Sequence, residues 1–300
     1  MKSYTLTTTA LGSFLCAGLL AFTGLSCKRA DSSGSGGRVT IQNRGSDTMV
    51  NLAQAWAEAY KKVHPEVKVE VGGGGSGVGI AALIKGTVDI ANSSRDIKPS
   101  EVEQMKKNTG KEPKEFTVGY DALAIFVHKS NPLENITTEQ LAQIYMEGGK
   151  ITKWSQLGVT IPGGGDDIVR VSRQSSSGTY EFFREHVLNN KDFKLGSRDM
   201  NGSKEVVELV GNTPTAIGYS GMGYATDKVK MLKVDGVAPT VETTLNRTYP
   251  IARALHLYTQ GEPTGAIKDY LDWILSEPGQ MLVQKTGYVP LPKEKWVKKP

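Results

Sequence analysis

In the first third of the chain, segments with strand-like spacing of apolar residues are each followed by a segment with helix-like spacing. A short β-branched run at 39–41 precedes apolar positions at helical spacing over 50–63, and the alternating stretch 67–71 precedes the apolar-periodic run 80–84. Alternation with a period of two is typical of strands, and a period of about 3.6 residues is typical of helices. The repeated order of strand, loop and helix from 38 to about 119 predicts an α/β fold with a mainly parallel sheet, whose ligand crevice lies at the carboxyl ends of the strands.

Two long apolar segments, at 116–127 and 249–258, are long enough to carry the chain from one domain to another and back. Two such crossings predict two lobes with a cleft between them, each lobe a mostly parallel sheet flanked by helices. We expect one lobe to comprise 38–119 plus 252–300 and the other to comprise 120–251.

Shorter elements follow from their end signals and apolar patterns. Thr137-Thr138-Glu139-Gln140 is similar to a capping box, so a helix is expected to begin there. Helices are also expected over 206–210, 265–275 and 278–285, and a strand over 216–219.

The N-terminal residues have the pattern of an export signal, which we place at 1–26. Lys2 precedes an apolar run over 10–25 that is short for a membrane span. Gly24-Leu25-Ser26-Cys27 resembles a bacterial lipobox, so lipidation of Cys27 and a flexible tether over 27–37 are expected. Simple cleavage of the signal with full release is the alternative.

The two cysteines, Cys16 and Cys27, both lie in this N-terminal segment, so the rest of the chain has no thiol for a disulfide or a catalytic nucleophile. The four histidines show no metal-binding spacing, and no metal is expected. The formal net charge of +5 is modest, and no run of Lys and Arg is interleaved with aromatic residues. We therefore expect no nucleic-acid partner.

Three loops that precede helices carry the candidate chemistry. Arg173 ends a β-like run and is followed by hydroxyls and by Ser177-Gly178-Thr179, which opens a helix; the glycine-rich loop 72–79 and the turn 43–49 follow the same order. Helix N-termini offer free N–H groups and a positive dipole end, and an arginine adds a forked charged donor, which together suit an oxyanion. Ser94-Arg95 follows a short buried strand and is expected on the same rim. The alternative is that these Ser and Thr residues are ordinary helix caps.

Two enzyme patterns are weak here. The glycine run 72–77 satisfies the dinucleotide-binding pattern only because repeated glycines satisfy many patterns, so no cofactor is expected. Ser76 has Val78 where a hydrolase nucleophile elbow needs a glycine. We expect no enzyme, and an exported serine-dependent phosphoesterase that uses Ser76 or Ser177 is the alternative from another class.

With these residues in view, the chain resembles the substrate-binding component of the bacterial high-affinity phosphate ABC transporter, a type II periplasmic binding protein. The resemblance covers essentially the whole chain after the signal and lies in Gly45-Ser46-Asp47-Thr48, the glycine run 72–79, 88–95, 148–154, Arg173 with 177–179, and Gly287-Tyr288-Val289-Pro290. It implies a monomer in the periplasm or cell envelope, anchored to the membrane through lipid, that binds inorganic phosphate and delivers it to the permease subunits without covalent chemistry. Alternatives are another tetrahedral oxyanion (sulfate, molybdate or tungstate) and a sensing role.

The resemblance also implies which residues bind phosphate. Carried over by position, they are Ser46, Asp47, Thr48, Met49, Ser76, Ser94, Arg95, Arg173, Ser177, Gly178 and Thr179. Well-known members have an Asp where this chain has Ser94, and that Asp accepts the proton of monohydrogen phosphate. They have a second Asp where this chain has Ser175. Our hypothesis is that Asp47 supplies the missing acceptor; the alternative is that Asp47 only caps the helix at 50–63.

Overall fold

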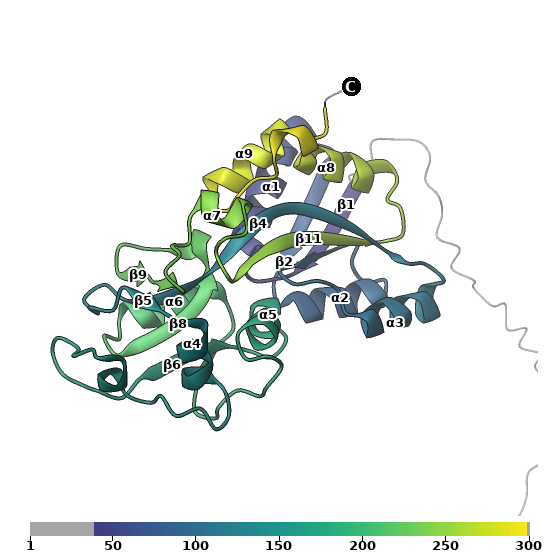
Figure 1. Ribbon diagram of the computed structural model, residues 1–300. Helices are drawn as coiled ribbons and strands as arrows, with labels where there is room; N and C mark the ends of the chain where they lie inside the picture. The colour runs from purple at the N-terminus through teal and green to yellow at the C-terminus, as the bar shows by residue number, and fades with distance from the viewer. Residues whose placement is uncertain (1–38, 299–300) are drawn as a thin grey trace, which may run out of the picture. The chain divides into compact units, whose positions relative to one another are not determined.

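Residues 39–298 are described by the computed structural model of the chain, in which a curled sheet runs through the whole described part (Figure 1). The proposed signal 1–26 and the whole tether 27–37, which includes Cys27, lie outside the described residues. Before the first long strand the elements are β1 (Val39–Gly45), α1 (Val50–Val63), β2 (Val67–Gly72), α2 (Ser76–Ile84), β3 (Ile90–Ser93) and α3 (Pro99–Thr109).

The sheet joins two parallel groups of strands through two long antiparallel ones. Within 39–298 its order is β2-β1-β3-β11-β4-β8-β6-β7, and β9 pairs with β4. β1 is parallel to β2 and β3, and β6 is parallel to β7 and β8, whereas β4 and β11 run antiparallel to their neighbours. The strands not yet placed are β4 (Pro113–His128), β6 (Val169–Arg173), β7 (Arg198–Met200), β8 (Ala216–Gly221), β9 (Val229–Met231) and β11 (Ala252–Gln260).

β4 and β11 are the two long segments that the sequence marks as crossings between domains. They pair with each other over the length of β11, and β4 continues from there to β8. The remaining elements are β5 (Asn135–Ile136), α4 (Thr138–Tyr145), α5 (Gly178–His186), α6 (Ser203–Gly211), β10 (Lys233–Val234), α7 (Val241–Leu245), α8 (Gly265–Leu275) and α9 (Glu277–Lys285), with short 3-10 turns at 154–157, 222–224 and 293–295. The expected α/β class with mostly parallel strands in each half is confirmed.

The buried apolar side chains fall into clusters on either side of the crossing strands. On one side, α1, α8 and α9 cover one face of the sheet and α2 and α3 the other (Figure 1). Trp56 of α1 is fully buried there, and its Nε1 donates to the carbonyl of Gly279 in α9 at 2.8 Å. This bond ties α1 to α9, which are far apart in the sequence.

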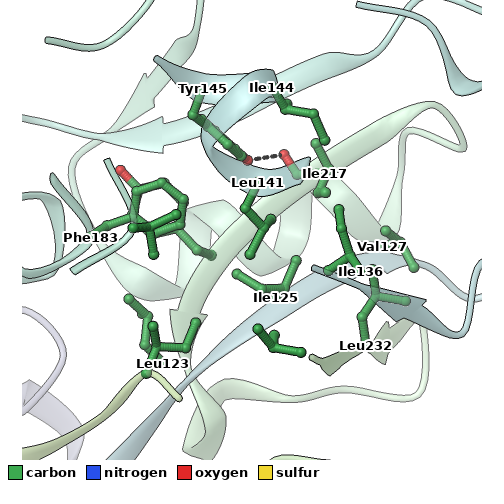
Figure 2. Close-up of a cluster of buried hydrophobic side chains, with 14 of the residues drawn as sticks. Leu123, Ile125, Val127, Ile136, Leu141, Ile144, Tyr145, Phe183, Ile217 and Leu232 are labelled. Atoms are coloured by element: carbon green, nitrogen blue, oxygen red, sulfur yellow. Dashed lines mark hydrogen bonds between the residues drawn. The ribbon is translucent and has the colours of Figure 1, made fainter. Parts of the chain in front are cut away.

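The second half has its own core, centred on aromatic side chains (Figure 2). The Tyr145 ring meets Phe183 and Tyr219 edge-on, and its hydroxyl donates to the Ile217 carbonyl at 2.8 Å. The fully buried members of this cluster come from 122–251, and those of the cluster around Trp56 come from 41–118 and 255–288. The segregation agrees with two lobes, while their limits stay a prediction.

Candidate anion-binding site

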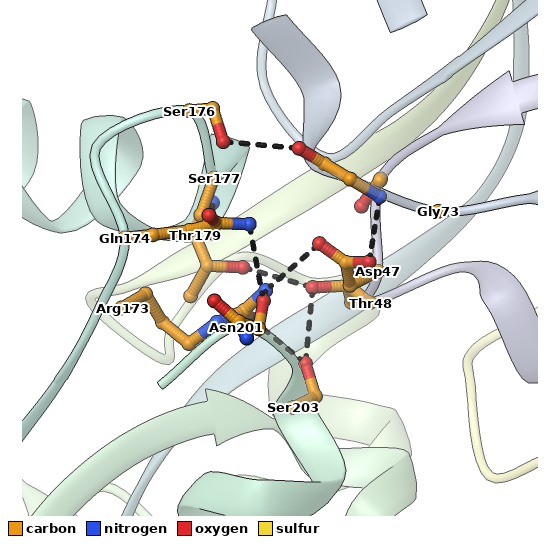
Figure 3. Close-up of polar contacts among 12 residues, drawn as sticks. Asp47, Thr48, Gly73, Arg173, Gln174, Ser176, Ser177, Thr179, Asn201 and Ser203 are labelled. Carbon is orange, nitrogen blue, oxygen red and sulfur yellow. Dashed lines mark hydrogen bonds and ion pairs between the residues drawn. The ribbon is translucent and has the colours of Figure 1, made fainter. Parts of the chain in front are cut away.

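The loops that the sequence singles out meet where the parallel strands end. Thr48 of the turn before α1 and Thr179 of the first turn of α5 bring their Oγ1 atoms within 2.8 Å of each other (Figure 3). Ser46 Oγ donates to Ser94 Oγ at 2.9 Å, and Ser76 Oγ lies 3.4 Å from Ser94 Oγ. All five side chains are buried. Helix starts from the two halves of the chain therefore form one buried cluster of hydroxyl groups.

Ser177 is a helix cap as well as a member of this cluster. Its Oγ accepts from the amides of Thr179 and Tyr180, at 3.2 and 3.4 Å, which is the N-cap geometry. Gly178 follows with no side chain, and a Cβ placed there would overlap Ser76 Oγ of α2. The cap interpretation and the anion-site interpretation thus describe the same residues, because capping fixes the first turn that faces α2.

Arg173 is the cation of the cluster. Its side chain is fully buried; Nη1 donates to Ser203 Oγ at 3.0 Å and Nη2 donates to the Asn201 carbonyl at 2.9 Å (Figure 3). Nη2 also lies 3.3 Å from Asp47 Oδ2, and Nε is buried without a hydrogen-bond partner among the described residues. Burial lowers the pKa of Arg173, and the Asp47 carboxylate opposes that shift. The guanidinium is held in place and keeps one donor for a ligand.

Asp47 does not cap α1, contrary to the alternative interpretation of its role. The N-cap position of α1 is Met49, and no side chain caps that helix. Asp47 Oδ1 instead accepts from the Gly74 amide at 2.9 Å, while Oδ2 faces Arg173. The Tyr224 hydroxyl donates to the Asp47 carbonyl at 2.9 Å, and its pKa is raised to about 12, chiefly by burial, so it is protonated at neutral pH. Asp47 therefore links the glycine loop to the arginine.

Three other positions differ in what they offer a ligand. The Met49 side chain is fully buried in the apolar cluster around Trp56, so the backbone is the part of Met49 that remains for a ligand. Arg95 makes a forked pair with Glu101, at 2.9 and 2.7 Å, which already neutralises its charge. Ser175 is exposed, whereas Ser94 is buried in the hydroxyl cluster. Of the two departures from the family pattern, the one at Ser94 lies inside the cluster.

Sequence reasoning missed four residues of this site. Asn201 and Ser203, at the start of α6, orient Arg173, and Asp121 and Arg253 form a buried ion pair behind Thr179. Burial raises the pKa of Asp121, while the Arg253 guanidinium and the Met222 amide oppose that shift. Ser203 gives a weak sequence signal, since it opens an amphipathic helix; nothing local marks the ion pair, because its members lie 132 positions apart.

The donor set suits a small, desolvated oxyanion. It consists of hydroxyls, the first amides of helices and a guanidinium, all of which donate to oxygen. Among residues 39–298 no group of three His, Cys, Asp or Glu side chains stands close enough to hold a metal ion. His186 Nδ1 contacts the Phe182 carbonyl at 3.1 Å, and His256 lies between Asp96 and Glu115. In the same range no helix is both long and apolar enough to cross a membrane.

Comparison with known proteins agrees with this geometry. A family model described as a PBP superfamily domain matches residues 30–278. The phosphate-binding protein PstS of Pseudomonas aeruginosa is 36% identical over 274 residues, which cover 86% of this chain and 85% of the relative. PstS of Bacillus subtilis is 34% identical over 257 residues, which cover 85% of this chain and 81% of the relative.

Solved structures give the same result. A putative phosphate ABC transporter substrate-binding protein from Clostridium perfringens, solved with bound phosphate, aligns with a TM-score of 0.76 and 34% identity over 84% of this chain and 100% of that one. An ABC-type phosphate transport receptor from Vibrio cholerae aligns with a TM-score of 0.69 and 31% identity, covering 84% and 100%.

The fold is that of a binding protein of the PBP superfamily, with the type II arrangement that the sequence predicts. Because relatives above 30% identity align along most of their own length, the chain belongs, within that superfamily, to the PstS family of phosphate-binding proteins. These relatives are binding proteins, so the chain is not an enzyme and the phosphoesterase alternative is not favoured.

Proposed function

We propose that this chain binds inorganic phosphate between its two lobes and delivers it to the permease of an ABC transporter for import. The observation that carries the proposal is the buried guanidinium of Arg173 amid hydroxyls from both halves of the chain, Thr48 on one side and Thr179 on the other. Relatives named for phosphate binding and a neighbour solved with bound phosphate support phosphate over the other oxyanions. The proposed ligand-binding residues are those carried over from the family, with Ser203 added.

Discrimination against sulfate needs a hydrogen-bond acceptor, and we assign that role to Asp47. Its carboxylate lies 3.3 Å from the Arg173 guanidinium and belongs to the turn that contains Thr48. Monohydrogen phosphate can donate its proton to the carboxylate, whereas fully ionised sulfate has no proton to donate and would place its charge against that of Asp47. A lost hydrogen bond to a charged group costs on the order of 1.5–3 kcal/mol, which is enough for a clear preference.

We propose that the permease recognises a closed, ligand-bound form, and contacts between the two halves of the chain support such a closed form. The Gly77 amide donates to the Ser176 carbonyl at 3.1 Å. The Ser176 hydroxyl, drawn in Figure 3, donates to the Gly74 carbonyl at 3.0 Å. Lys98 Nζ also pairs with Glu181 Oε2 at 3.0 Å. These contacts join loops from the two proposed lobes and surround the anion site, so an anion held by both lobes shifts the equilibrium toward closure.

We also propose export and anchoring, with residues 1–26 as the signal, lipidated Cys27 as the membrane anchor and a monomeric binding unit. The support is the lipobox-like sequence before Cys27. Labelling of cells with a radioactive fatty acid is expected to mark the wild-type chain and not Cys27→Ser, which is expected to leave the membrane fraction. If the wild type and Cys27→Ser were retained equally in the membrane fraction, the anchoring proposal would be wrong, and the proposal of phosphate binding would be unaffected.

The test of binding is calorimetric titration of residues 28–300, unfolded and refolded to remove any ligand carried through purification. Phosphate, sulfate and molybdate are titrated in turn, and a chromogenic phosphate ester is added as an enzyme control. We expect tight one-to-one binding of phosphate, weak or absent binding of the other two anions, and no hydrolysis. Preference for sulfate or molybdate, or turnover that is lost in Ser76→Ala, would overturn the proposal.

A further inference from the structure

A buried ion pair lies behind the anion site, on the two strands that cross between the halves of the chain. Arg253 of β11 and Asp121 of β4 are direct partners in the antiparallel register. Arg253 donates to Asp121 Oδ2 through Nε at 3.0 Å and Nη2 at 2.8 Å, and the two side chains are at most 1% exposed. The Met222 amide donates to Asp121 Oδ1 at 3.1 Å. The carboxylate therefore fixes the orientation of the guanidinium.

The remaining arm of the guanidinium contacts both halves of the anion site. Nη1 of Arg253 donates to the Ser94 carbonyl at 3.2 Å and to Thr179 Oγ1 at 3.1 Å. Ser94 precedes the first crossing strand and Thr179 follows it, so a single nitrogen bridges the two. The guanidinium carbon also lies 5.5 Å from the centre of the Phe182 ring, within the range of a cation–π contact.

This contact limits which hydrogen bonds Thr179 can still form. A guanidinium is always charged and has no acceptor, so the Thr179 oxygen must accept from Arg253 and one of its lone pairs is occupied. Arg173 acts in the same way on Ser203, whose oxygen accepts from Nη1 at 3.0 Å. Each of these two hydroxyls keeps its proton and one lone pair, and the proton can go either to Thr48, 2.8 and 3.4 Å away, or to a ligand. The two guanidinium groups thus bias the hydroxyl cluster toward donating.

We propose that Arg253, oriented by Asp121, is a positioning residue for anion binding that acts through Thr179. It occupies an acceptor site of that hydroxyl, directs the hydroxyl proton toward an oxyanion, and holds the Ser94 loop and the α5 start in one arrangement. This inference rests on the proposed function, because Thr179 is one of the residues assigned to phosphate.

The competing interpretation is that the pair only stabilises the crossing strands. Arg253 also lines a cavity of about 690 Å³, together with Arg95, Tyr249 and the exposed Arg247. Arg247 serves as a matched control, since Arg247→Lys makes the same chemical change in the same cavity at a side chain outside the ion pair.

A double-mutant cycle separates the two interpretations. Arg253→Lys keeps the charge beside Asp121 and removes the fork that reaches Thr179, and Thr179→Val removes the hydroxyl. Phosphate affinity is measured by calorimetry for the wild type, both single variants, the double variant and Arg247→Lys, and thermal unfolding without phosphate is recorded for each. Residues that act through each other give non-additive changes, and independent ones give additive changes.

We expect Arg253→Lys to weaken phosphate binding about tenfold, the effect of losing a hydrogen bond near a charged group, and to cause no further loss in the Thr179→Val background. Arg247→Lys is expected to bind as the wild type does. Unchanged affinity in Arg253→Lys, or the same loss in both backgrounds, would overturn the inference while leaving phosphate binding intact; a wild type that binds no phosphate would overturn the proposed function itself. If Arg253→Lys does not fold, the neutral pair Asp121→Asn with Arg253→Gln replaces it in the same cycle under the same criteria.

Discussion

Arg173 is the residue on which the chemistry of the site depends most. Its guanidinium is fully buried and is held by Asn201 and Ser203 at the start of α6 and by Asp47 before α1. A buried arginine needs partners for its donors, and Nε has none among the described residues. An oxyanion would satisfy that donor and compensate the charge.

Arg173→Lys is expected to weaken phosphate binding by about ten- to a hundredfold, since hydrogen bonds to charged groups contribute about 1.5–3 kcal/mol and an ammonium cannot reproduce the fork. Arg170→Lys on the same strand is the matched control, because Arg170 Nη2 donates to the Leu195 carbonyl instead. Calorimetry with phosphate measures both variants. Equal losses in the two would mean that strand β6, and not the site, had been disturbed.

Asp47→Asn is expected to bring phosphate and sulfate affinities closer together, mainly through a gain for sulfate, because the amide removes the acceptor charge that excludes an anion without a proton. Competition binding at a fixed pH gives the ratio directly. The exposed Asp96→Asn is the control. An Asp47→Asn variant that still binds phosphate as tightly as wild type and refuses sulfate would show that another group discriminates.

Residues whose roles are local could be predicted from the sequence, and residues whose roles depend on distant partners could not. Ser177 and the capping box at Thr137 act on amides two or three positions away, so their patterns are visible in the sequence. Asp121 and Arg253 meet only because β4 and β11 pair, and no local pattern encodes that register. The loops that contain Thr48 and Thr179 were singled out because each leads into a helix, whereas the 2.8 Å contact between the two hydroxyls is a product of the fold.

At the scale of elements, the helix starts determine the shape of the site. α2 and α5 approach so closely at their first turns that Gly178 has no room for a side chain. The same packing brings Ser76 and Ser94 against α5. The Gly77 amide in the first turn of α2, which has no partner within its helix, donates to the Ser176 carbonyl just before α5, so the two helix starts are held together.

Gly178→Ala is expected to weaken phosphate binding about ten- to a hundredfold. An added methyl group at a tightly packed contact costs about 1–3 kcal/mol, and here that cost destabilises the closed form in which α2 and α5 meet. Stability without phosphate should change little if the halves separate in the free protein. Glu185→Ala, exposed on the same helix, is the control. Unchanged phosphate affinity in Gly178→Ala would contradict the close approach of α2 and α5 in the bound state.

Trp56→Phe is expected to lower the free energy of unfolding by about 1–3 kcal/mol, since it removes a buried hydrogen bond to Gly279 and leaves a smaller ring in the core. Urea unfolding measures the change. The partly buried Trp273→Phe should lose less. A Trp56→Phe variant as stable as wild type would show that the bond between α1 and α9 contributes little.

Whether a helix could be predicted depended on how strongly apolar residues recur along it, as α8 and α3 illustrate. α8 was predicted with the observed bounds because several apolar residues recur along it, of which Tyr270, Leu271 and Ile274 are buried. α3 was not predicted: Met105 is its one buried residue, so the apolar period barely registers. Its start signals, Pro99 at the first position and Glu101 two residues later, are weak without that period.

At the scale of the whole described unit, the two halves meet through polar contacts around the anion site. A charge pair across the cleft, Lys98 with Glu181, is partly exposed, so it contributes little by itself, about 0–1 kcal/mol. We expect such a pair to affect how readily the two halves close, and to have little effect on the contacts that bind the anion.

Lys98→Glu is therefore expected to weaken phosphate binding only a few-fold by placing like charges across the cleft, and the added change Glu181→Lys is expected to restore it. Both effects should shrink at high salt, because exposed charges are screened. Titration at low and high ionic strength checks this. Failure of the reversed pair to recover affinity would mean that Lys98 and Glu181 do not meet in the bound protein.

The central claim is that an oxyanion is held between Arg173 and the hydroxyls of Thr48, Ser76 and Thr179. The most direct measurement is a crystal structure of residues 28–300 with arsenate, a phosphate analogue whose arsenic is located by anomalous scattering. We expect a single arsenic site whose oxygens lie within hydrogen-bond distance of Arg173 Nε and these hydroxyls. Arsenic in the cavity lined by Arg95 and Arg247, or absent from the hydroxyl cluster while calorimetry shows arsenate binding, would contradict the claim.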